Sequence, residues 1–118
     1  MESILTSIKK LLGIAEGYTH FDDDLILHIN SIFSVLTQMG IGPSTGYMIT
    51  DAGNTWDEFT ENKFYYEGVK NYIHLRVKLV FDPPLSSAVT EAINKMITEL
   101  EWRLFAASET KSLRGEEV

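Results

Sequence analysis

The clearest helical pattern in this chain runs from Ser86 to Ala107 and reads SSAVTEAINKMITELEWRLFAA. Its apolar side chains recur three and four residues apart, which places them on one face of a helix. This stripe consists of Val89, Ile93, Met96, Ile97, Leu100 and Leu104. Glu91 precedes Lys95, and Glu99 precedes Arg103, by four residues, the order that stabilises a helix. The pattern predicts a long amphipathic helix and, with it, a domain built from helices.

Two aromatic residues of this predicted helix lie off its apolar stripe. At 100° per residue, Trp102 and Phe105 point almost opposite the face from Val89 to Leu104. Either another part of the same chain covers them, or they belong to a subunit interface, where aromatic residues are enriched. We take both as candidate interface residues.

The preceding segment, Phe64–Phe81, fits two patterns. Ile73–Leu79 alternates apolar and polar residues, which is typical of a strand. The polar residues of the whole segment nevertheless share one helical face, and its length favours a helix over a strand. The segment is apolar on most sides, so it needs more than one packing partner. Tyr65 and Tyr72 are therefore further candidates for a subunit interface.

The N-terminal half contains three more predicted helices. Ser3–Leu12 and Asp22–Met39 each carry apolar residues at helical spacing, and the aspartates that begin the second suit the positive end of its dipole. Thr55 and Glu58 form the pattern of a capping box, which predicts a short helix there. Together with the two later segments, the sequence predicts an all-α bundle of four to five helices.

A glycine-rich loop, Gly40–Asn54, separates the second and third predicted helices. Its glycines and proline break regular structure, and only Tyr47–Thr50 has the composition of a short β segment. Loops of this length in small domains are usually functional or mobile. We expect the loop to be mobile in the free subunit and to become ordered against a partner through Tyr47, Met48 and Ile49.

Composition excludes several classes of function. The 118 residues include no cysteine and carry a net charge of -7, so thiolate metal sites and strong nucleic-acid binding are not expected. No apolar run approaches the length of a membrane span. The three histidines have no metal-site spacing, and no catalytic or phosphate-loop motif is present. We expect no enzyme activity, no metal, no cofactor and no membrane partner.

One stretch is more distinctive than helix formation requires. Tyr72–Pro84 reads YIHLRVKLVFDPP, and it is followed by Ser86-Ser87 and, after a helix, by Glu99–Leu104, ELEWRL. These motifs resemble the small head–tail connector proteins of tailed bacteriophages, also called head-completion or adaptor proteins. The glycine-rich loop leading to Thr55-Trp56 looks like that family too, and the resemblance extends over most of the chain, to about Leu104.

The resemblance implies a structural virion protein of the phage neck, assembled in the cytoplasm of the bacterial host. It implies a homo-oligomeric ring beneath the portal protein, a dodecamer in the virion, that extends the DNA channel and docks the next head-completion or tail protein. DNA would pass through the lumen without specific binding. Residues 1–107 would form the connector domain, and 108–118 a flexible charged tail. The alternative is a small cytosolic helical enzyme or regulatory domain that uses residues 40–54 as a ligand lid.

Overall fold

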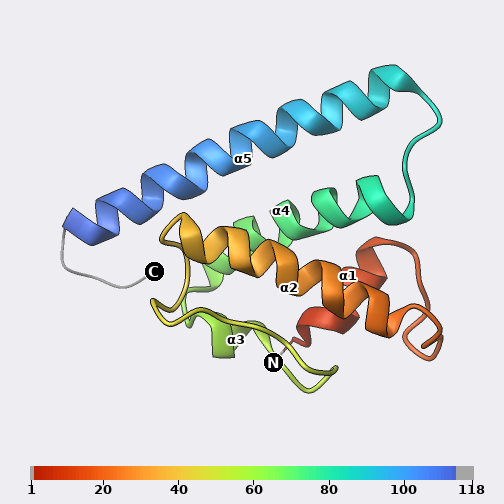
Figure 1. Cartoon of the computed structure of the whole chain (residues 1–118), viewed down its shortest axis with the longest axis horizontal. Coiled ribbons are helices and arrows are strands. Elements are labelled where there is room, and N and C mark those ends of the chain that lie inside the picture. The colour runs from red at the N-terminus through yellow and green to blue at the C-terminus, as the bar shows by residue number, and fades with distance from the viewer. Residues whose placement is uncertain (1, 114–118) are drawn as a thin grey trace.

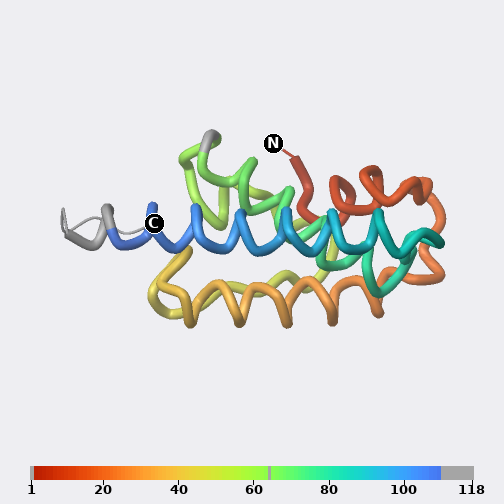
Figure 2. The backbone as a smooth tube through the Cα atoms, turned by 90° about the horizontal axis from the view of Figure 1, so that it is seen from above, coloured from red at the N-terminus to blue at the C-terminus, as the bar shows by residue number. Residues whose placement is uncertain are grey.

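The fold is all-α, as predicted. In the computed structural model, residues 2–113 are described, without the side chains of Phe64 and 110–113. This part of the chain contains no strand and forms five helices: α1 (Ile4–Leu11), α2 (Asp22–Gln38), α3 (Trp56–Phe59), α4 (Lys63–Phe81) and α5 (Ser87–Leu113). In Figure 1, α5 runs antiparallel to α4 along one side of the molecule. Figure 2 shows α5 lying over α4, with α2 on one side and α1 on the other.

Helix α4 is the centre of the bundle. It packs against each of the other four helices, and its side chains Val69, Tyr72, Ile73 and Val77 are at most 1% exposed. This explains why its sequence fits two patterns: a helix that is covered on most sides has no clean polar face. The ambiguity of Phe64–Phe81 is thereby resolved in favour of a helix. The additional packing partners that its sequence requires are other helices of the same subunit.

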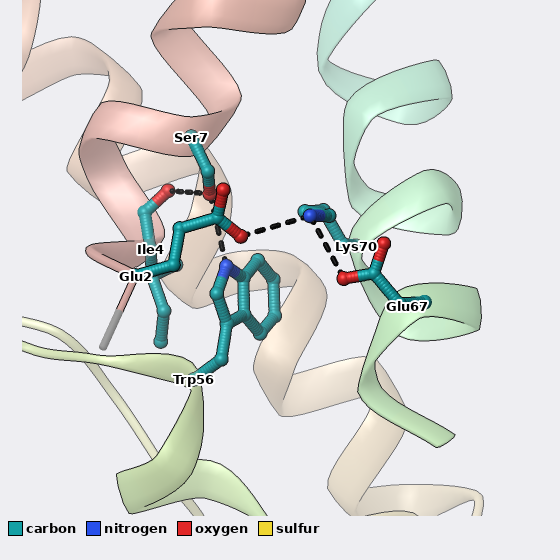
Figure 3. Close-up of polar contacts among 6 residues, drawn as sticks. All are labelled: Glu2, Ile4, Ser7, Trp56, Glu67 and Lys70. Atoms are coloured by element: carbon teal, nitrogen blue, oxygen red, sulfur yellow. Dashed lines mark hydrogen bonds and ion pairs between the residues drawn. The ribbon is translucent and has the colours of Figure 1, made fainter. Parts of the chain in front are cut away.

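A polar cluster docks the N-terminal segment against α3 and α4 (Figure 3). The indole N–H of the fully buried Trp56 donates a hydrogen bond to the Ser7 hydroxyl at 2.9 Å. At the margin of this cluster, Lys70 forms ion pairs with Glu2 at 2.8 Å and with Glu67 at 2.9 Å. Because the indole nitrogen is satisfied internally, Trp56 can lie in the core without an unpaired donor.

A buried lysine holds the connection between α1 and α2. The Lys9 side chain is almost completely enclosed, and its ammonium donates to the carbonyl oxygens of Glu16 at 3.0 Å and Tyr18 at 2.8 Å. It also forms an ion pair with Asp22 at 2.8 Å. Asp22 therefore contributes through this ion pair and the helix dipole, because the start of α2 has no side-chain capping bond.

The last helix is longer than predicted. It continues to Leu113, although the sequence predicted its end near Ala107. The Ser108 side chain is buried and its hydroxyl donates to the carbonyl oxygen of Gly40 at 2.7 Å, which ties α5 to the end of α2. The flexibility of the tail stays a prediction for residues 114–118, which lie outside the described residues.

Candidate subunit interface

The outward face of α5 exposes two large aromatic side chains. Trp102 is 72% exposed and Phe105 is 46% exposed. On the opposite face of the same helix, Ile93 and Leu104 are buried against the bundle. The core of the subunit is therefore complete without the Trp102 ring. The arrangement leaves an apolar surface without a partner in the described chain, as a subunit interface would.

A hydrogen bond between α4 and α5 helps to fix which face of α5 points outward. The Tyr72 hydroxyl donates to the Glu101 carboxylate at 2.8 Å and accepts from the Arg76 guanidinium at 3.1 Å. Burial is the main cause that raises the pKa of Tyr72, and the hydrogen bond to Glu101 adds to it. The phenol therefore stays protonated and keeps donating at neutral pH.

Three of the predicted interface residues lie in the core instead. Tyr72 is fully buried, Ile49 is 1% exposed and Tyr65 is 8% exposed, so their side chains cannot form an outer surface in this fold. The reason for Tyr65 and Tyr72 is the position of α4 among the other helices. Burial raises the pKa of Tyr65, whose hydroxyl has no hydrogen-bond partner within the described part of the chain.

The glycine-rich loop is held against α2. The Asn30 side chain accepts from the backbone N–H of Ile49 at 2.8 Å and donates to its carbonyl oxygen at 2.9 Å. Tyr47 is half-buried, with its ring edge-on to Phe33 at 5.1 Å between centroids. Its neighbour Met48 is 63% exposed. No strand forms at the expected short β segment, since these backbone groups bond to a side chain rather than to a neighbouring strand.

A hydrogen bond to α3 also holds the loop. The Tyr47 hydroxyl donates to the Glu58 carboxylate at 3.1 Å, and burial together with this negative charge raises the pKa of Tyr47. Hydrogen bonds from the Asn54 side chain and the Thr55 backbone, with a smaller effect from Tyr47, lower the pKa of Glu58. Only the Met48 side chain of the three loop candidates is largely exposed. An ordering of the loop by a partner stays a prediction.

A second group of aromatic rings was not predicted from the sequence. Phe21 contacts Phe81 with ring centroids 6.1 Å apart, and Phe81 lies edge-on to His28 at 5.2 Å. Tyr18 and Phe21 are 49% and 37% exposed. These residues come from the α1–α2 connection, α2 and the last turn of α4, so no local pattern relates them. The one available signal was the density of aromatic residues between Tyr18 and Phe21.

The described residues offer no evident catalytic or metal-binding arrangement. Within residues 2–113, no three histidine, aspartate or glutamate side chains gather where they could hold a metal ion. The helices in this range are also too short or too polar to cross a lipid bilayer. The buried polar groups around Trp56 and Lys9 bond to one another and hold helices together. What the surface does offer is exposed aromatic area.

Comparison with known protein families identifies a match. A protein-family model described as "Phage connector protein" matches residues 4–111, which is nearly the whole chain. No curated protein and no solved structure matches the chain.

Proposed function

The chain belongs to the phage connector protein family, and we propose that it forms a closed ring beneath the portal that extends the DNA channel. Members of this family are structural proteins of the virion that contact other head or tail proteins. In the proposed ring, one end of each subunit meets the portal protein and the other docks the next head-completion or tail protein. A dodecamer is the expected form in the virion.

The observation that carries the proposal is the exposed aromatic face of α5. With 72% of its side chain exposed, Trp102 offers about 180 Å² to a partner. A stable interface needs about 800 Å² on each side, so this anchor alone does not suffice for tight association. We infer that free subunits associate weakly and that the portal, which offers several adjacent binding sites, acts as the template for the ring.

The charge of the chain supports a channel through which DNA slides. With seventeen acidic and ten basic residues, the chain has a net charge of -7. Strong binding to DNA requires clustered lysines and arginines that displace counterions from the phosphates. An acidic ring, added after packaging, would let DNA pass during ejection without holding it.

The ligand-lid alternative has less support. A lid must open, whereas Ile49 is buried and bonded on both its backbone groups to Asn30. The family is also one of structural proteins rather than enzymes.

Sedimentation with the portal protein of the same phage tests the proposal. We expect the chain to sediment alone as a small species and to join the portal in a fixed ratio when the two are mixed. A chain that never binds the portal, at any ratio, would contradict the proposed place in the neck.

A further inference from the structure

We propose that a pocket between α2 and α4 receives the Trp102 side chain of a second copy of this chain. This inference rests on the proposed ring and identifies the surface that covers the outward face of α5. The pocket has a volume of about 150 Å³. Its described lining includes His28, Ser31 and Val35 of α2, and Arg76, Val77 and Val80 of α4.

The size and chemistry of the pocket suit one aromatic ring. A cavity of about 150 Å³ is large enough to hold benzene. The valine side chains form an apolar wall, and Arg76 supplies the one formal charge among the described lining residues. A guanidinium packs well on the face of an indole. Arg76 already lies over one ring, with its central carbon 5.7 Å from the centroid of Tyr72.

The surroundings of the pocket are apolar and exposed. Val80 on its rim is 58% exposed, and Leu27, next to His28 in the chain, is 65% exposed. The His28 ring that lines the pocket is in contact with Phe81, which in turn contacts Phe21. A partner that inserts one ring would therefore also cover the apolar residues around it.

The pocket and Trp102 of one subunit cannot meet each other. Leu104 packs towards α4, with a methyl 3.8 Å from where a β-carbon on Gly68 would lie. Trp102, two residues earlier, points to the opposite side and is largely exposed. Each subunit thus has a projecting indole and a separate pocket with room for one of its rings, and only another copy can bring them together.

Charge favours the same pairing. The outward face of α5 carries the exposed side chains of Glu91, Lys95 and Glu109 close to the direction of Trp102, which gives this face one net negative charge. The pocket carries the positive charge of Arg76. Because two different surfaces meet, the contact is head-to-tail, and repetition of such a contact closes a ring when the rotation between subunits permits.

The absence of cysteine allows a direct test by disulfide cross-linking. One full-length variant, Ser31→Cys, places a thiol at the pocket. A second, Thr98→Cys, places a thiol one helical turn from Trp102 and keeps the Trp102 side chain. The two variants are mixed in the presence of the portal protein and then oxidised. The matched control replaces Ser31→Cys with Ser34→Cys, which is on the same helix, also exposed and outside the described lining.

We expect the Ser31–Thr98 pair to cross-link in much higher yield than the control pair. Adding Trp102→Ala to the Thr98→Cys chain should weaken association by roughly 30-fold or more and abolish the cross-link. If rings form on the portal but the two cysteine pairs cross-link in equal yield, the pocket assignment is overturned and the proposed function still stands. A Ser31→Cys chain that cross-links to the portal instead would also overturn it. If the wild-type chain forms no ring on the portal, both proposals fail.

Discussion

Replacing Trp102 with alanine should separate assembly from folding. The matched change is Trp56→Ala, which removes the same side chain from the core. Trp102 is 72% exposed and Trp56 is fully buried. For Trp102→Ala we expect the free energy of unfolding to change by no more than about 0.5 kcal/mol, because the change is at the surface and alanine favours the helix. For Trp56→Ala we expect a loss of about 3–5 kcal/mol.

Although Trp102→Ala should barely change stability, we expect it to weaken assembly strongly. Burying the roughly 180 Å² that Trp102 exposes is worth up to about 4.5 kcal/mol at 25 cal/mol per Å². Anchor residues of interfaces typically contribute 2 kcal/mol or more, which corresponds to about 30-fold in the dissociation constant. Urea denaturation followed by circular dichroism measures the free energy of unfolding, and sedimentation with the portal measures the strength of assembly.

Two results would contradict the assignment of Trp102 to an interface. If Trp102→Ala unfolds as readily as Trp56→Ala, then Trp102 belongs to the core of the subunit. If Trp102→Ala is stable and still assembles like the wild type, then the outward face of α5 is not the interface.

Three further predictions concern the subunit itself. Lys9→Met should destabilise the fold by about 2–4 kcal/mol in urea, because it leaves the carbonyl oxygens of Glu16 and Tyr18 and the partly exposed Asp22 carboxylate without the buried ammonium. The exposed Lys10→Met should cost no more than about 0.5 kcal/mol, and equal costs would contradict the structural role of Lys9. Burial, with a smaller effect from a nearby lysine, lowers the pKa of His74. Because the unfolded chain then binds the proton more tightly, the melting temperature should fall as the pH drops below about 6.5. If His74→Gln does not flatten this pH dependence of the melting temperature, the prediction is wrong. The backbone N–H of Ile49 should exchange slowly with solvent deuterium. Asn30→Ala should speed this exchange and lower the free energy of unfolding by about 1–3 kcal/mol. Fast exchange in the wild type would mean that the loop is mobile.

The periodicity of the sequence predicted the helices well because each helix places its apolar side chains on the bundle. The exception was Ile73–Leu79, whose alternating pattern arises because α4 is covered on most sides. The same property made Tyr65 and Tyr72 look like interface residues. A pattern shows that a side chain needs a partner, but not whether the partner belongs to the same chain.

Other features depend on contacts between distant segments. Lysine in a short amphipathic helix usually faces solvent, so nothing in the sequence indicated that Lys9 is buried with the carbonyl oxygens of the following connection. The contact between Phe21 and Phe81 joins residues sixty positions apart. In contrast, Trp102 and Phe105 could be identified, since their position on a single helix depends only on local geometry.

The central claim is that this chain forms a ring in the neck of the virion. A reconstruction of the intact phage neck by electron cryomicroscopy tests it most directly, because the side chains of the five helices can be matched to density. We expect a closed ring of this chain directly beneath the portal, with the outward face of α5 covered by the next subunit. A well-resolved neck that contains no copy of this chain would contradict it.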